Sequence, residues 1–375
     1  MASTRWLLVL MLWPLPWLQM VKSGFSVQRF ANVAKWNPSV IIPTDGVYLI
    51  SVIVDPFLGR NLTLLLYCKC QGKERFVFSA HGEAIYSHAE VATVLKKNDM
   101  LLLKKIGETI EAASSFSVVY VGDVNSFYIT MMNSVFWNDE SPVQYTSRLT
   151  PNGWTLLKDP IKQTTFTIST TGMYWVTARP KPYLSPLTMT VRIGSEDLFS
   201  AFGEKGRSVS ASGAFYLKSG SKIQAVTQGG VIYEPQTLLS AVYLAGNKKP
   251  NTYPFEHLAF TAELDSTRRV VAQEVLQFKR VLTNYGYIYV DGYTEIRGTG
   301  SYMVSIRPDP ESTILVIVTL FVDGRFYWAI YAEEGVPVGA TISLSLQLGS
   351  YLEVRSSKVS TLGSGTMFSI AFIQP

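Results

Sequence analysis

The chain has 375 residues, a formal net charge of +5, and a composition that is 47% hydrophobic, 13% aromatic and 16% charged. This composition is typical of a folded protein rich in β-strands, and it excludes a disordered or low-complexity chain. The excess positive charges are few and scattered, and paired lysines such as Lys96-Lys97 are expected in solvated loops. We therefore expect no nucleic-acid partner.

The first residues of the chain have the features of a secretory signal peptide. Arg5 supplies a positive charge, and Trp6 to Leu18 form an apolar run of the length that an h-region needs. A single membrane anchor is the alternative, but Pro14 and Pro16 interrupt the run and leave it short for a bilayer. We predict a cleaved signal at residues 1–23 and a secreted, extracellular protein.

Two short sequence phrases recur three times in the same order along the chain. The first places a glycine two residues before a tyrosine, at Gly46-Val47-Tyr48, Gly172-Met173-Tyr174 and Gly300-Ser301-Tyr302. The second is an apolar run that closes each copy, at Ser115 to Val121, Leu238 to Leu244 and Met367 to Ile373. The glycines are 126 and 128 residues apart, so the period is nearly constant. The chain is predicted to hold three copies of one domain of about 120 residues.

These phrases place copy one at 25–122, copy two at 125–245 and copy three at 257–375. Within each copy, short alternating or apolar runs are separated by turn residues, as in the run from Ile314 to Val322 that ends at Asp323-Gly324. No segment shows a convincing helical period. We predict an all-β chain in which each copy is a β-sandwich or jelly roll.

Both phrases have a physical interpretation. A glycine before the tyrosine would allow a positive φ, and hence a tight turn, where the strand begins. The tyrosine and the apolar residue two positions later would then share one face of that strand. The closing phrase is hydrophobic on both faces, which favours a central strand or one covered by a neighbouring domain.

Copy three carries several motifs in a fixed order. They are Ala259-Phe260-Thr261-Ala262, Val281 to Gly286, Tyr289, Gly300-Ser301-Tyr302 and Phe368 to Phe372. With these motifs copy three resembles, from end to end, the globular head of the complement-1q family, within the tumour-necrosis-factor-like jelly-roll superfamily. In copy two the resemblance covers Phe127, residues 166–176 and 217–220, and the closing phrase.

The chain departs from the family pattern in three respects. Val118, Ala241 and Ile370 stand where the family usually has a glycine in the last strand. Copy one has only 21 residues between its first phenylalanine and its Gly-x-Tyr phrase, against 45 in copy two, which predicts that about two early strands are absent or replaced. There is also no collagen-like Gly-X-Y run.

The resemblance implies assembly, because domains of this superfamily form tight trimers. Three copies in one chain therefore suggest an intramolecular pseudo-trimer, and tethering favours closure within the chain. The alternative is a string of domains that each recruit partners from other chains as a homo-oligomer. The framework or trimer-face positions implied by the resemblance are Tyr48, Tyr174, Tyr302, Phe116, Leu239 and Phe368.

Cys68 and Cys70 are the only cysteines of the chain. In a strand, residues two apart share a face, and their Cα separation is near the limit of disulfide geometry. One alternative is therefore an interchain or an unusual local disulfide, and the other is a pair of buried or free thiols. Metal binding is disfavoured, because two thiols with a few scattered histidines make a poor zinc site.

Little else in the sequence indicates a chemical site. Asn61-Leu62-Thr63 is an N-glycosylation sequon after a turn, so we predict a glycan on Asn61. His81, His88 and His257 fall in no nucleophile or metal motif, so no enzyme and no cofactor are expected. The resemblance makes calcium conceivable, but no acidic cluster matches a family site, and we assign none.

The sequence thus predicts a secreted, non-enzymatic recognition or signalling protein. Like complement-1q and tumour-necrosis-factor proteins, it would bind a receptor, a glycan or another extracellular protein through its jelly-roll head. A matrix protein that forms multimers, with Cys68 or Cys70 as the link, is one alternative. A membrane-tethered ligand is another, if the leader is not cleaved. The ligand itself cannot be read from framework residues.

Overall fold

The computed structural model describes residues 25–29, 39–54, 61–70, 72–83, 87–107, 115–122, 128–133, 142–143, 147–150, 153–156, 164–182, 185–204, 207–230, 237–244, 258–311, 315–333 and 335–374. Throughout these ranges the regular structure is antiparallel β-strand without a helix, which confirms the all-β prediction. The same ranges accordingly contain no helix that could cross a membrane. The predicted signal peptide at 1–23 lies outside them and stays a prediction.

Copy one is a sandwich of two four-stranded sheets. Its strands are β1 (Phe25–Arg29), β2 (Ser39–Ile41), β3 (Gly46–Val54), β4 (Asn61–Cys70), β5 (Lys73–Glu83), β6 (Ser87–Leu95), β7 (Met100–Gly107) and β8 (Ser115–Gly122). The sheet orders are β1-β8-β3-β6 and β2-β7-β4-β5. Successive strands thus cross between the two sheets as in an eight-stranded jelly roll. We call the sheet that holds the Gly-x-Tyr strand the inner sheet and its partner the outer sheet.

Copy two repeats this arrangement with additional strands. They are β9 (Tyr128–Asn133), β10 (Ser147–Thr150), β11 (Gly153–Leu156), β12 (Thr165–Thr167), β13 (Gly172–Arg179), β14 (Leu187–Ile193), β15 (Glu196–Glu204), β16 (Arg207–Ser208), β17 (Ala211–Leu217), β18 (Lys222–Gln228) and β19 (Thr237–Tyr243). The inner sheet is β11-β10-β9-β19-β13-β17 and the outer sheet is β12-β18-β14-β15-β16.

Copy three follows the same plan. Its strands are β20 (Ala259–Glu263), β21 (Arg268–Val270), β22 (Arg280–Tyr285), β23 (Ile288–Val290), β24 (Tyr293–Glu295), β25 (Gly300–Arg307), β26 (Val316–Val322), β27 (Arg325–Ala332), β28 (Ala340–Leu346), β29 (Tyr351–Ser356), β30 (Ser360–Leu362) and β31 (Met367–Gln374). The inner sheet is β22-β20-β31-β25-β28, the outer sheet is β23-β24-β29-β26-β27, and β21 pairs with β30. The edge strands β10, β11 and β22 have no counterpart among the described residues of copy one, whose first segment is the short one.

The repeated tyrosine anchors the start of the same strand in all three copies. The hydroxyl groups of Tyr48, Tyr174 and Tyr302 each donate to a carbonyl four residues upstream, at 2.8, 2.6 and 2.5 Å. Each ring also contacts an aromatic side chain of the closing strand, with centroids 5.2 to 5.4 Å apart. Burial raises the pKa of Tyr48 and of Tyr174 to about 12, so both remain proton donors at neutral pH.

The glycine before that tyrosine serves a different purpose from the one predicted. Gly46 and Gly172 do not have a positive φ, so the predicted left-handed turn is wrong at both positions. A Cβ atom at Gly46 would instead clash with the ring of Tyr120, and one at Gly172 with the ring of Tyr243. The glycine is needed because the aromatic ring of the closing strand occupies the space of a side chain.

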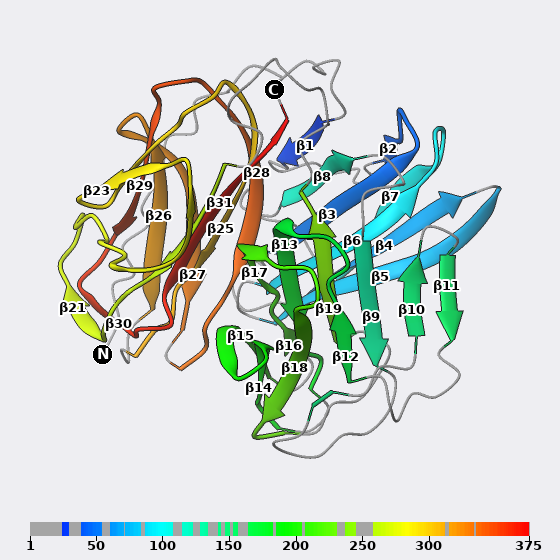
Figure 1. Ribbon diagram of the computed structural model, residues 1–375, viewed down its shortest axis with the longest axis horizontal. Helices are drawn as coiled ribbons and strands as arrows, with labels where there is room; N and C mark the ends of the chain where they lie inside the picture. The colour runs from blue at the N-terminus through cyan, green and yellow to red at the C-terminus, as the bar shows by residue number, and fades with distance from the viewer. Residues whose placement is uncertain are drawn as a thin grey trace, which may run out of the picture.

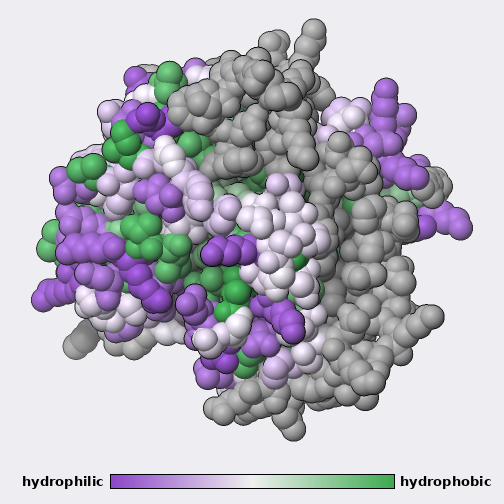
Figure 2. Space-filling view, in the orientation of Figure 1, coloured by the Kyte–Doolittle hydropathy of each residue, from purple (hydrophilic) through white to green (hydrophobic). Residues whose placement is uncertain are grey.

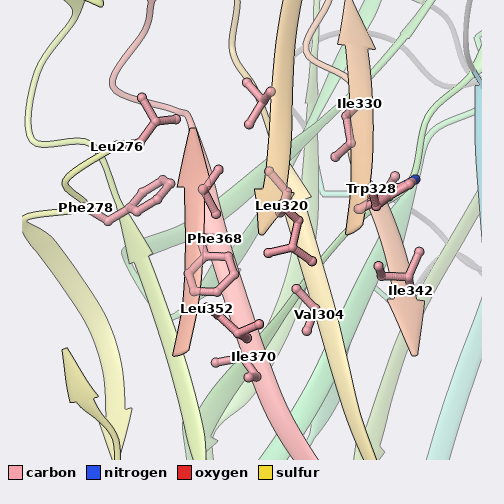
Figure 3. Close-up of a cluster of buried hydrophobic side chains, with 14 of the residues drawn as sticks. Leu276, Phe278, Val304, Leu320, Trp328, Ile330, Ile342, Leu352, Phe368 and Ile370 are labelled. Atoms are coloured by element: carbon pink, nitrogen blue, oxygen red, sulfur yellow. The ribbon is translucent and has the colours of Figure 1, made fainter. Parts of the chain in front are cut away.

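The six predicted framework or trimer-face residues lie inside the sandwiches. Tyr48 and Phe116 belong to the core of copy one, Tyr174 and Leu239 to that of copy two, and Tyr302 and Phe368 to that of copy three. Figure 3 shows Phe368 among the core side chains of copy three. Because side chains alternate along a strand, these residues face their own outer sheet, and their neighbours face the other copies.

Those neighbours form one apolar cluster between the three copies, which we call the centre. Its buried members are Val47, Leu49, Ala92, Val119, Val121, Met173, Trp175, Ala214, Val242, Leu244, Ala259, Met303 and Ala371. In Figure 1 the inner sheets meet in the middle of the molecule, with copy three on the left. The closing strands β8, β19 and β31 are thus covered on both faces, as their apolar sequences predicted. The three copies pack as a pseudo-trimer within one chain.

Candidate functional site

A row of outward side chains, three of them aromatic, crosses the outer sheet of copy three. Cross-strand pairing aligns Val290, Tyr293, Glu353, Phe321 and Phe326, one from each strand of the sheet. All five face away from the core, because the residues beside them, such as Leu320 and Leu352, are core residues. We call these five residues the aromatic row.

The row is open to solvent at the positions that carry most apolar surface. Phe326 is 57% exposed, Val290 58% and Tyr293 41%. Ile288 and Tyr351, in the neighbouring line of outward residues, are exposed as well. In Figure 2 hydrophobic residues lie in groups among hydrophilic ones over copy three. An exposed apolar group of this kind on a folded domain commonly marks a binding surface.

A tight hairpin turn brings Phe321 and Phe326 together. Asp323 and Gly324 both have a positive φ, which joins β26 to β27 in a tight hairpin. This turn sets Val322 opposite Arg325 and Phe321 opposite Phe326, and a β-bulge follows between Phe321 and Leu320. Their rings meet edge to face with centroids 6.2 Å apart.

A charged pair lies in the middle of the row. The guanidinium carbon of Arg355 lies 4.5 Å from the centroid of the Phe321 ring, in a cation–π contact. Arg355 also donates to Oε1 of Glu353 at 2.5 Å. Glu353 is only 3% exposed. Within the described part of the chain, its Oε2 and the Nε of Arg355 have no hydrogen-bond partner. The row therefore combines apolar ring faces with one unused acceptor and one unused donor.

The equivalent place in copy two has a different character. Arg192 pairs with Asp197 next to a bulge beside Val191, at the positions of Phe321 and Phe326. Gln224 stands where Glu353 stands in copy three. Arg192 and Asp197 form a largely solvent-exposed ion pair. The same backbone therefore carries a polar surface in copy two and an aromatic one in copy three.

A second concentration of functional groups lies beside the centre. Oε1 of Glu90 accepts hydrogen bonds from Trp175 Nε1 at 2.8 Å, Thr177 Oγ1 at 2.6 Å and Ser212 Oγ at 3.2 Å. His88 Nε2 lies 3.8 Å from the other carboxylate oxygen. Burial raises the pKa of Glu90, although the hydrogen bonds from Thr177 and Trp175 oppose that shift. Burial lowers the pKa of His88 to about 3. Both groups are fully buried. The hydrogen bonds from copy two to Glu90 therefore join copy one to copy two inside the molecule.

Cys68 and Cys70 form a disulfide with each other, with Cα atoms 5.3 Å apart. Among the described residues, Asp99 completes the only group of three Cys, His, Asp or Glu side chains close enough to hold a metal ion. In the disulfide the two sulfur atoms are bonded to each other and are not available as thiolate ligands. The pair is thus a local cross-link within β4.

The other predicted residues lie apart from the aromatic row. Asn61 begins β4, but its side chain is outside the description, so its glycosylation stays a prediction. His81 contacts Thr63 Oγ1 at 2.7 Å, and His257 lies outside the described ranges. No sequence motif had pointed to the aromatic row. The signal was present in the alternating run that ends at Asp323-Gly324, since a tight hairpin there sets Phe321 beside Phe326.

Comparisons with known proteins leave the chain without an assigned family. No family model matches it, that of the complement-1q head included, and no curated protein matches it. Among solved structures it is similar to a tandem CBM22 domain of Paenibacillus barcinonensis Xyn10C, with 9% identity, a TM-score of 0.22, and coverage of 66% of this chain and 93% of that one.

A second similar structure, PNGF-II, has 9% identity and a TM-score of 0.27, over 84% of this chain and 98% of that one. A triple jelly roll from an archaeal virus has 11% identity and a TM-score of 0.20, over 93% of this chain and 88% of that one. TM-scores this low carry no argument about fold or function. The strand order itself defines the class: a triple jelly roll whose third outer sheet carries the aromatic row.

Proposed function

We propose that the chain is a non-catalytic recognition protein that binds an extracellular oligosaccharide on the aromatic row of copy three. The observation that carries the proposal is the combination, on one exposed sheet, of ring faces with the Glu353–Arg355 pair. Pyranose rings have apolar C–H faces that stack on aromatic rings, and hydroxyl groups that both donate and accept hydrogen bonds.

The size of the row favours a small ligand. Its five strands span about 20 Å, and two lines of outward side chains give about 300 Å² of surface. A stable protein–protein interface needs about 800 Å² on each partner. A short oligosaccharide fits the smaller area.

The charges favour a neutral ligand. Arg355 and Glu353 compensate each other at 2.5 Å, so the row offers no net charge to a polyanion. The unused Glu353 Oε2 would accept from a sugar hydroxyl, and the unused Arg355 Nε would donate to one, after a small movement of either side chain.

The remaining features agree with a secreted recognition protein of the complement-1q type. The signal peptide expected at 1–23 would bring the chain to extracellular glycans. The Cys68–Cys70 bond uses both cysteines of the chain, which supports this role over that of a disulfide-linked matrix protein.

The proposal is tested by applying the full-length secreted chain to an array of immobilised glycans. We expect binding to a defined set of neutral glycans, and at least about a tenfold loss for Phe326→Ala, because exposed aromatic anchors dominate small interfaces. Asp197→Ala, at the equivalent place in copy two, is the matched control and should bind like the wild type. Absence of glycan binding, or equal binding by Phe326→Ala, would overturn the proposal.

A further inference from the structure

Copy one carries a second surface with the same construction. Tyr67 pairs with Phe76 across β4 and β5 next to a bulge beside Leu66, as Phe321 pairs with Phe326 next to the bulge beside Leu320. The rings of Tyr67 and Phe76 meet edge to face with centroids 5.7 Å apart. The two aromatic pairs therefore occupy equivalent positions in copies that differ strongly in sequence.

The cation is repeated as well. Lys104 Nζ lies 4.4 Å from the centroid of the Tyr67 ring, much as Arg355 lies over Phe321. Lys104 and Arg355 occupy equivalent positions. Tyr67 pairs with Leu102 on β7, and Lys104 lies two residues after Leu102. Phe321 pairs with Glu353 on β29, and Arg355 lies two residues after Glu353. Lys104 donates to Glu74 Oε1 at 2.5 Å, so this cation is also balanced by a carboxylate.

The surface in copy one is accessible. Phe76 is 47% exposed, and the side chains of Lys104 and Glu74 are 45% and 43% exposed. The carboxylate comes from β5, because Leu102 occupies the position of Glu353. Copies one and three thus share three features: an aromatic pair, a cation stacked on one of its rings, and a carboxylate that balances the cation. In copy two the Arg192–Asp197 ion pair takes their place.

We propose that Tyr67, Phe76 and Lys104 form a second site for a neutral oligosaccharide of the same class, so that the chain binds two ligands and the outer sheet of copy two binds none. This inference rests on the proposed function of copy three. The site in copy one is the weaker one, because an exposed lysine presents a single flexible charge where Arg355 presents a fixed planar fork.

Two sites on one rigid head make binding to a glycan-coated surface tighter than binding to free glycan. Once one site is occupied, the second binds at a high local concentration, and the gain reaches about a hundredfold or more where both sites reach the same surface. Loss of either site should remove this gain.

The test is titration calorimetry of the full-length chain with the neutral oligosaccharide that gives the strongest array signal, alongside retention of the chain on a surface coated with it. We expect two ligands per chain for the wild type, one for Phe76→Ala, one for Phe326→Ala and none for the double variant. Either single variant should lose at least about tenfold in surface retention. Lys104→Gln, which keeps the ring pair, should weaken the copy-one site alone.

The outcomes separate the two proposals. One ligand per wild-type chain, abolished by Phe326→Ala and unaffected by Phe76→Ala, would overturn the second site and leave the proposed function standing. No ligand at all would overturn both. If Phe76→Ala loses thermal stability, a lower number of bound ligands in that variant reports misfolding and not the loss of a site. The Lys104→Gln variant then decides: if it is folded and still binds two ligands with unchanged affinities, the second site is overturned.

Discussion

The outer sheets of copies two and three share four strands in the same order, β12-β18-β14-β15 and β24-β29-β26-β27, and a bulge at the same place. Between that bulge and the turn, however, the cross-strand pair is Arg192 with Asp197 in copy two and Phe321 with Phe326 in copy three. On the other side of the bulge, both copies pair an aliphatic with an aromatic side chain inside the core. These pairs are Val191 with Phe199 in copy two and Leu320 with Trp328 in copy three. The comparison teaches that the inward positions specify the sandwich, whereas the outward positions of the same strands are free to acquire or lose a binding surface.

The strongest test of this comparison removes the two inward aromatic residues. Phe199→Ala in copy two and Trp328→Ala in copy three should each lower the free energy of unfolding by about 3–5 kcal/mol, because each leaves a cavity in a packed core. Phe199 stacks on Phe215 with centroids 5.6 Å apart, and Trp328 lies among the core side chains of Figure 3. Urea unfolding measures both values.

The outward replacements Phe326→Ala and Asp197→Ala serve as controls for that experiment. Each should change the free energy of unfolding by less than about 1 kcal/mol, because exposed side chains contribute little. The comparison breaks down if an outward replacement destabilises as much as its inward neighbour.

A second prediction concerns pH, because two titratable groups of copy one, Glu90 and His88, are buried where copies one and two meet. His88 has a pKa of about 3 in the fold against 6.5 when unfolded, so the stability that it contributes falls as pH drops below about 6.5. The pKa of Glu90 is raised above 4.5, so its contribution falls as pH rises above about 4.5 and through the raised value.

Between these limits the two effects oppose each other. Below about pH 4.5 only the His88 effect acts, so the junction should lose stability as the pH falls toward 3. Arg179, fully buried on β13 and with its own pKa lowered to about 9 by burial, contributes to the shift at His88. Glu90→Gln removes the opposing carboxyl effect, so the stability of this variant should rise more steeply with pH above about 4.5 than that of the wild type, and it should keep the acid loss. Thermal unfolding across pH 3–9 checks this, and a Glu90→Gln profile identical to that of the wild type would contradict it.

A smaller effect should be the same in all three copies. Replacing Tyr48, Tyr174 or Tyr302 with phenylalanine removes one hydrogen bond to a backbone carbonyl and leaves the ring contacts in place. Each change should cost about 1 kcal/mol in the free energy of unfolding. Three similar changes in the free energy of unfolding would show that this hydrogen bond stabilises all three copies equally, even where their outer surfaces differ. A change near zero in one copy would contradict this.

Much of the fold was predictable because it depends on local patterns. The recurring Gly-x-Tyr and closing phrases located the strands β3, β13 and β25 and the strands β8, β19 and β31, and the apolar closing strands do lie covered on both faces. The role of the glycine was not predictable, because the ring that excludes a side chain at Gly172 belongs to Tyr243, on a different strand.

The candidate site was harder to predict, because it depends on register. The turn at Asp323-Gly324 sets Phe321 beside Phe326, but the positions of Glu353 and Arg355 beside them are set by pairing with β29. The Glu90 junction was equally hidden, because its donors lie about one domain away in sequence. No local pattern encodes such contacts, whereas the framework phrases repeat in every copy.

The Glu90 junction also decides which copies can stand next to one another. Its three donors, Trp175, Thr177 and Ser212, occupy positions that in copy one are held by Leu49, Ser51 and Glu90 itself. A ring made of copy one alone would therefore set three carboxyl groups against one another and remove the indole donor, a repulsion that a buried site does not tolerate. The single chain thus sets the hydrogen-bond donors of copy two beside the carboxyl group of copy one, an arrangement that three identical copies could not make.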